Sequence, residues 1–142
     1  MACPFFEPDQ PVEMQHPFRL PLIDEYTGYC HLRGSAVTRE ANPRLRLLGC
    51  NHGNLQRVCA FLNQQDGSGA RGRPARFSVR RRGADRLWVL FVEEENGRPY
   101  AWQEFEYHPQ DGSVLPDLVD ACRRAQLLAF CRSYLTRYPL SA

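Results

Sequence analysis

The sequence predicts an α+β fold, in which an antiparallel three- to four-stranded β-meander packs on a C-terminal helix and follows a cysteine-bearing N-terminal half of loops and short helices. Two patterns carry this prediction. Apolar residues alternate with polar ones at period two over residues 75–108, and they recur at helical spacing over residues 116–138. The 142 residues, 43% of them hydrophobic, match the size and composition of one globular domain, so we expect a single domain over 1–142.

Prolines mark the first 22 residues of the chain. They occur at Pro4, Pro8, Pro11, Pro17 and Pro21. Because proline has no backbone N–H and a fixed φ, this density excludes a continuous helix and a strand in the interior of a sheet. We therefore expect residues 1–22 to form an extended arm that lies over the domain.

The cysteine-bearing region spans residues 23–63. Its first part, Tyr26–Val37, has the composition of extended chain, and Gly28 and Gly34 interrupt it as bulges or points of close backbone approach. Two short helices are predicted after it, and the second of them carries Cys59.

The sheet is predicted from three runs of β-forming residues that follow a glycine-rich loop over residues 64–74. These runs are Phe77–Arg80, Leu87–Val92 and Tyr100–Tyr107. Gly83-Ala84 predicts the first hairpin turn, and Asn96-Gly97 predicts the second because both residues tolerate the positive φ of a type I′ turn. The middle run is apolar on both faces, which places it at the centre of the meander, within residues 75–108.

The C-terminal helix is expected over residues 116–138. Pro116-Asp117 is typical of a helix start, and the apolar residues that follow form a stripe that covers one face of the sheet. Cys122 and Cys131 belong to this stripe, so we interpret them as small buried core residues.

The charge of the chain and its lack of recognisable targeting signals limit the classes of partner and compartment that we expect. All 18 basic residues are arginine, and the net charge of +2 is too small to indicate a polyanionic partner for the whole molecule. No apolar run reaches the length of a membrane-spanning helix, and the N-terminus has no basic and apolar signal-peptide pattern. We expect a cytoplasmic protein without a membrane span.

Four of the six cysteines occupy positions where a core residue is not typical. Cys3 precedes a proline near the chain end, Cys30 follows glycine-rich chain, and Cys50 and Cys59 lie beside a helix stop and on a short helix. Loops and helix ends supply backbone N–H groups that stabilise thiolates, so these four residues are the candidate metal ligands. The alternative is four unrelated reduced cysteines.

A [4Fe–4S] cluster is the cofactor that this pattern favours. Structural zinc sites usually draw ligands in closely spaced pairs, and this chain has no such pair, whereas a cluster can be held from separated segments. Zn²⁺ is the alternative, with His31 or His52 in place of one thiolate. Because four protein ligands leave no open position for a substrate, we expect a structural or electron-transfer role with a protein partner in a larger assembly.

A nucleic-acid-binding module is the alternative from another class. Arg71-Gly72-Arg73-Pro74 resembles the AT-hook, which inserts into the minor groove of DNA. The arginines of this alternative are Arg71, Arg73, Arg76, Arg80 and Arg82, and the aromatic residues beside them that would stack on bases are Trp88, Phe91, Tyr100 and Trp102. We favour the simpler interpretation, a solvated strand face with the aromatic residues in the core.

Catalytic signatures do not point to an enzyme. The sequence has neither a phosphate-binding loop of the Walker type nor a Gly-x-Ser-x-Gly motif, and its histidines lack the spacing of a zinc protease. We name no catalytic residue and expect a non-enzymatic role.

Overall fold

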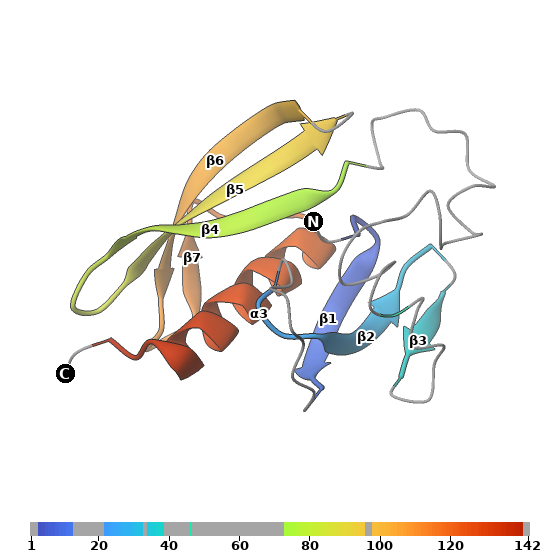
Figure 1. The fold of residues 1–142 in the computed structure, drawn as a ribbon, viewed down its shortest axis with the longest axis horizontal. Coiled ribbons are helices and arrows are strands. Elements are labelled where there is room, and N and C mark those ends of the chain that lie inside the picture. Colours follow the sequence, from blue (N-terminus) through green and yellow to red (C-terminus); the bar gives the residue numbers. More distant parts are fainter. Residues whose placement is uncertain are drawn as a thin grey trace.

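The structure, a computed structural model, describes residues 3–12, 22–32, 34–38, 46, 73–95 and 98–140. Over these residues it consists of two antiparallel sheets and one C-terminal helix (Figure 1). The predicted α+β class, with a meander packed on a C-terminal helix, is confirmed.

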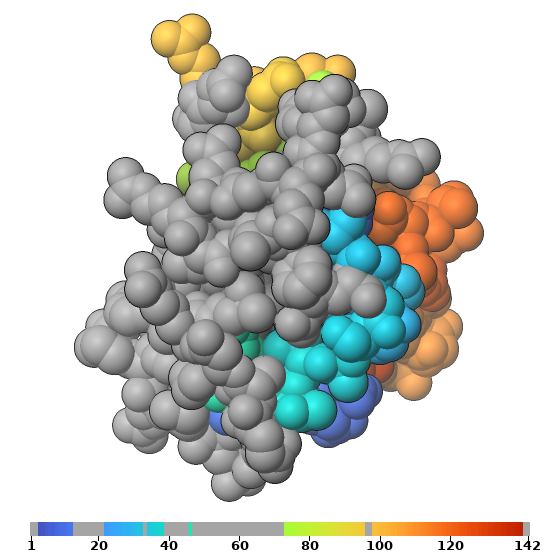
Figure 2. Space-filling view, turned by 90° about the vertical axis from the view of Figure 1, so that its right-hand side faces the viewer, coloured from blue at the N-terminus to red at the C-terminus, as the bar shows by residue number. Residues whose placement is uncertain are grey.

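The N-terminal sheet has three strands in the order β1-β2-β3. They are β1 (Phe6–Pro11), β2 (Tyr26–Cys30) and β3 (Ser35–Val37). The proline-rich arm supplies β1, which lies at the edge of the sheet, where a strand can hold prolines without losing inner ladder hydrogen bonds. Figure 2 shows the cyan residues of β2 and β3 at the surface, beside the orange residues of the C-terminal part of the chain.

Gly28 lets β1 and β2 approach closely. It pairs with Pro8, and a Cβ at residue 28 would lie 2.0 Å from the carbonyl oxygen of Glu7. Only glycine fits at this position without displacing the β1 backbone. Gly34 has a φ of +68° in the turn between β2 and β3. The predicted close backbone approach is therefore confirmed at Gly28.

The second sheet is a meander of four strands in chain order. They are β4 (Ala75–Arg82), β5 (Leu87–Glu95), β6 (Arg98–His108) and β7 (Ser113–Leu115). The doubly apolar strand β5 lies between β4 and β6, as predicted. Gly83 donates its N–H to the Arg86 carbonyl at 2.9 Å and closes the first hairpin. The predicted second turn, 96–97, lies outside the described residues, between the paired residues Glu95 and Arg98.

The C-terminal helix, α3 (Ala121–Arg137), begins later than the sequence predicted. The chain does not leave the sheet after residue 111 but turns back, so that Ser113 pairs with His108 and β7 forms. β7 ends at Leu115 and residues 116–120 are not helical, so the predicted start of helix 116–138 is wrong by five residues. Asp120 is the N-cap, and its Oδ1 accepts from the Arg123 N–H at 2.9 Å.

The helix α3 lies against both sheets (Figure 1). Its Phe130 ring stacks on Phe77 of β4 with centroids 5.9 Å apart, while Gln126 reaches the start of β1. Cys122 and Cys131 are both buried, as predicted. In the described part of the chain, no helix has the length and apolar character needed to cross a membrane. Of the two short helices predicted before residue 63, only residue 46 belongs to that part, and the loop up to residue 72 lies outside it.

Candidate metal centre and the arginine-bearing sheet face

Cys3 is the first residue of a β-turn that leads into β1. The Phe6 N–H donates to the Cys3 carbonyl at 3.2 Å, and Pro4 and Phe5 form the corner. Proline is favoured at this corner because its fixed φ matches the turn. Cys3 is buried and belongs to the main hydrophobic core, although it lies close to the N-terminal end of the described chain.

Cys30 lies beside this turn, at the end of β2. Its Cα is opposite Phe6 in the β1–β2 ladder, and the His31 N–H donates to the Phe5 carbonyl at 2.9 Å. A β-turn brings its first and fourth Cα atoms within about 7 Å, and opposed residues in an antiparallel pair have Cα atoms about 5 Å apart. These two relations place Cys3 and Cys30, both buried, at the same end of the ladder, with Cα atoms at most about 12 Å apart.

The first turns of α3 border the same place. Gln126, which is fully buried, donates from Nε2 to the Cys3 carbonyl and to the Phe6 carbonyl, both at 2.7 Å. Its Oε1 accepts from Nη1 of Arg123 at 2.8 Å, and Arg123 also donates to the Arg73 carbonyl. A buried arginine and a buried glutamine thus connect the helix to the Cys3 turn.

Electrostatics links these groups as well. Burial raises the pKa of the Cys122 thiol to about 11, and the neighbouring Asp120, Glu7 and Cys30 act in the same direction. Burial lowers the pKa of the Arg123 guanidinium, whereas Glu93, Cys3, Asp120 and Cys122 raise it. Cys3 therefore acts on Arg123 and Cys30 acts on Cys122, both in the first turn of α3.

The other predicted ligands are placed less fully. Cys50, Cys59 and His52 lie outside the described residues, so their part in the ligand set stays a prediction. Within the described ranges, no group of three or more histidine, cysteine, aspartate or glutamate side chains is arranged to hold a metal ion. His31 is exposed, and its Nε2 lies 2.6 Å from Glu7 Oε2, on the edge of the Tyr29 ring.

The arginines of the alternative site lie on the four-stranded sheet, where most are engaged by neighbours. Arg73 lies over the Tyr100 ring at 3.4 Å, and Arg76 is 3.6 Å from Glu94. Arg80 is exposed at a β-bulge. Arg82 donates to the carbonyls of Tyr138 and Pro139 at 3.2 and 2.9 Å, and so fastens the chain after α3. Arg71 lies outside the described residues.

The aromatic residues of that site do not share one face. Trp88 lies under Arg81, and Trp102 is 72% exposed. Phe91, in contrast, is buried and packs against Phe77 and Phe105 in the core, so its inclusion in a stacking platform was wrong. Residues of β5 alternate between the two faces, and Phe91 has the opposite parity to Trp88.

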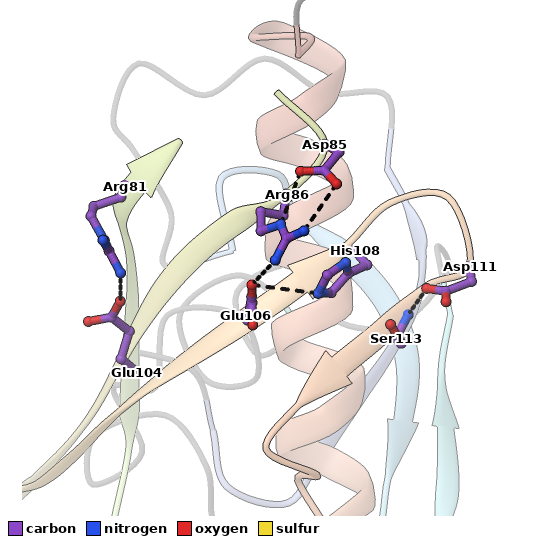
Figure 3. A network of polar contacts seen from close by, with 8 residues as sticks. All are labelled: Arg81, Asp85, Arg86, Glu104, Glu106, His108, Asp111 and Ser113. Atoms are coloured by element: carbon purple, nitrogen blue, oxygen red, sulfur yellow. Dashed lines mark hydrogen bonds and ion pairs between the residues drawn. The ribbon is translucent and has the colours of Figure 1, made fainter. Parts of the chain in front are cut away.

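Carboxylates neutralise many of the charges on this sheet (Figure 3). Arg86 donates to Glu106 Oε1 at 2.6 Å and to Asp85, and these hydrogen bonds raise its pKa. His108 Nε2 is 3.7 Å from the same Glu106 oxygen, and Arg81 is 3.4 Å from Glu104. The sheet therefore carries a mixed ion-pair network and not a purely positive surface.

Sequence reasoning missed Arg123 and Gln126, the two polar residues that border Cys3. Both are at most 6% exposed, whereas the buried face of this helix was predicted from its apolar residues alone. Their spacing of three residues, which places them on one helical face, was the available signal.

No protein-family model, curated protein or solved structure matches the chain.

Proposed function

We propose that the chain holds a metal centre, a [4Fe–4S] cluster in the first place, through Cys3, Cys30, Cys50 and Cys59. The observation that supports this most is that Cys3 and Cys30 lie at the same end of the β1–β2 ladder, each linked to Phe6. Both cysteines are buried although they are remote in sequence, one in a turn and one at a strand end, and separated segments of this kind can supply cluster ligands.

The two described ligands fit such a group in their chemistry. Cys3 is followed by Pro4, whose missing N–H leaves no competing donor and whose ring fixes the turn. Burial of both residues keeps water away from the site, and exclusion of solvent is one of the factors that set cluster potentials. When bound, a [4Fe–4S] cluster supplies one-electron transfer or a structural cross-link between the segments that hold it.

The role that we propose is structural or electron-transferring, within a larger assembly. Four thiolate ligands complete the coordination of the cluster, and this geometry suits electron passage better than substrate binding. The protein partner is part of the proposal, and the cytoplasm is the compartment that we propose for it.

Anaerobic purification with metal analysis tests this proposal. We expect a brown protein that absorbs near 400 nm and contains about four iron and four sulfide per chain. Cys3→Ser and Cys30→Ser should each lose most of that absorbance. Cys131→Ala is the matched control, because Cys131 is a buried thiol two turns of α3 beyond the site and should leave the iron content unchanged.

The same measurement separates the alternatives. A colourless protein with one zinc per chain would favour the zinc site over the cluster, provided that the zinc is lost in Cys3→Ser and Cys30→Ser. A folded protein without bound metal after anaerobic reconstitution with iron and sulfide, and with zinc, would refute the metal centre.

The nucleic-acid alternative has one supporting observation. Arg76 and the exposed Trp102 lie on the same rung of the sheet, on either side of Val92, so a cation and an aromatic ring lie on one face of the sheet, two strands apart. Retention of single-stranded DNA that falls with salt, and that is lost in Arg76→Gln but kept in Arg124→Gln, would favour this second function.

A further inference from the structure

The four-stranded sheet has an outer face, which points away from α3 and is apolar along its central strand. Successive residues of a strand point to opposite faces, and the odd positions of β5, from Leu87 to Phe91, belong to the core on the α3 side. An antiparallel sheet with one solvated face normally carries polar residues at the alternate positions. In β5 the outward positions are instead Trp88, Leu90 and Val92.

Two large apolar side chains on this outer face are open to solvent. Trp102 of β6 is 72% exposed and Leu115 of β7 is 54% exposed, while α3 lies on the opposite side of the sheet (Figure 1). Val92 is buried but does not belong to the main core cluster. Exposed apolar residues that adjoin an apolar strand are typical of a surface that another molecule covers.

Charge is divided across the outer face between its two sides. On one side of β5, β4 presents the exposed arginines Arg76 and Arg81. On the other side, β6 presents Glu104 and Glu106, each one rung of the sheet apart from the next outward residue. A basic side and an acidic side are therefore separated by the apolar positions of β5.

The acidic side already has cationic partners from its own chain. Arg81 lies 3.4 Å from Glu104, and Arg86 donates to Glu106 at 2.6 Å (Figure 3). Removing a charge from water is costly when no opposite charge accompanies it. The outer face can therefore be covered without leaving these carboxylates uncompensated.

We propose that a second copy of this chain covers the outer face, in a two-fold symmetric dimer whose axis runs along β5. Such an axis sets β4 of each copy against β6 of the other, so the basic side of each face meets the acidic side of its partner. Two sheets that pack face to face keep their strand directions within about 30° of each other. The inference uses no cysteine and does not depend on the metal centre.

The register of the sheet determines which residues meet in this dimer. Arg81 shares a rung with Glu106, and Arg76 shares a rung with Trp102, in each case across β5. The two-fold axis therefore sets Arg81 of one copy opposite Glu106 of the other, and Arg76 opposite the Trp102 ring, a favourable cation–π arrangement. Leu90 lies on the axis and meets its own counterpart.

The other two-fold arrangement is disfavoured by the same charges. An axis that runs across the strands would set β4 against β4 and β6 against β6. Arg76 would then face Arg81, and Glu104 would face its own counterpart. Like charges that face each other across an interface weaken association. The division of charge across the outer face thus selects the axis along β5.

Sedimentation velocity of the full-length protein at several concentrations up to about 100 µM tests the dimer. We expect twice the mass of one chain. Leu90→Glu sets two carboxylates against each other on the axis and should weaken the dimer about a hundredfold. Gln103→Glu is the matched control, because Gln103 is an exposed residue of β6 that points to the α3 face, on the rung of Phe91. A monomeric wild type, or equal dimerisation in the two variants, would overturn the inference.

Trp102→Ala decides if Leu90→Glu does not fold. The ring is largely exposed, so its removal should leave the fold of the monomer intact. A tryptophan in the centre of an interface contributes strongly to affinity, and we expect dimerisation to weaken at least about tenfold. Wild-type dimerisation in a folded Trp102→Ala protein would overturn the inference.

Cross-linking tests the direction of the axis. A short bismaleimide should link Leu90→Cys to its own counterpart, whereas Ser78→Cys faces Glu104 of the other copy and should link to itself much more slowly. The wild-type chain measures the background from its native cysteines. Rapid self-linking of Ser78→Cys would show the axis across the strands and overturn the arrangement along β5.

Nucleic acid is the competing occupant of the outer face. A monomeric wild type that retains single-stranded DNA, and loses this retention in Arg76→Gln, would assign the face to nucleic acid and overturn the dimer. Iron analysis is a separate measurement. A dimer without bound metal would refute the metal centre alone, and a monomer with full iron content would refute the dimer alone.

Discussion

The two faces of α3 are held by different kinds of contact. Toward the four-stranded sheet the contacts are aromatic, with Phe130 stacked on Phe77 and Phe77 packed on Phe91 at 5.4 Å. Toward the three-stranded sheet they are polar and buried, through Gln126 and through Tyr26, whose hydroxyl donates to the Ala129 carbonyl at 2.9 Å.

This difference indicates which side of α3 tolerates the smaller change in the relative position of its partners. Apolar packing is tolerant of small shifts as long as volume is filled, whereas buried hydrogen bonds must meet in distance and direction or cost free energy. The arm and β2 are therefore fixed on α3 in one register by the polar contacts. The candidate centre lies on this side of the helix.

The largest expected effect comes from the aromatic side. Phe130→Ala should lower the free energy of unfolding by about 3–5 kcal/mol, because it removes a buried ring and leaves a cavity between α3 and β4. Urea denaturation followed by circular dichroism measures this. Tyr138→Ala, at a half-exposed ring just after α3, is the control and should cost much less. Equal losses in the two variants would show that the Phe130 contact does not hold the sheet.

A smaller and more local effect is expected on the polar side. Gln126→Leu keeps the volume but leaves the carbonyls of Cys3 and Phe6 without this donor, and should cost about 2 kcal/mol. Hydrogen exchange, compared between the variant and wild type, should become faster in β1 and β2 and change less in β4–β6. Gln103→Leu, at an exposed position of β6, is the control. Equal acceleration of hydrogen exchange in both sheets would contradict the view that the polar contacts fix only the three-stranded sheet on α3.

The smallest effect concerns pH. The hydrogen bond from Arg137 lowers the pKa of the Asp24 carboxyl, and this pair joins the end of α3 to the segment before β2. A carboxyl with a depressed pKa stabilises the fold above its unfolded pKa, and that contribution is lost as the pH falls through its folded pKa. Solvent screening keeps it small because both side chains are partly exposed.

Asp24→Asn tests this ion pair. The variant should lose part of the decline in stability that wild type shows on acidification below about pH 4, with little change at pH 7 beyond the small loss of the pair. Asp85→Asn is the comparison, because Asp85 is the more exposed carboxyl and its pKa is likewise lowered by a hydrogen bond, from Arg86. An acid profile of Asp24→Asn identical to that of wild type would show that the pair adds nothing.

Local patterns in the sequence predicted the four-stranded sheet well. The run of β-forming residues Leu87–Val92 and the turn at Gly83 are properties of neighbouring residues, so they can be read without knowing the fold. The start of α3 was misplaced because Pro116-Asp117 is an acceptable helix start, whereas the residue that caps the helix is Asp120, whose side chain accepts from the Arg123 N–H.

The candidate site depended on contacts that no local pattern encodes. The register that sets Cys30 opposite Phe6 comes from pairing between remote segments, and Gly28 makes that pairing possible. The roles of Arg123 and Gln126 required knowledge of what faces α3 on both sides. The cysteines could be singled out by their unusual positions, but not the polar residues that border them.

The placement of the two tryptophans makes tryptophan fluorescence a specific probe of the four-stranded sheet. Trp88 and Trp102 stand on adjacent strands of the four-stranded sheet, and the chain has no other tryptophan. Intrinsic fluorescence therefore reports the β4–β7 side, while the N-terminal sheet contributes to the dichroism of the backbone but is silent in tryptophan emission. If the N-terminal sheet detaches from α3 before the rest unfolds, the two signals will trace separate transitions in the same titration.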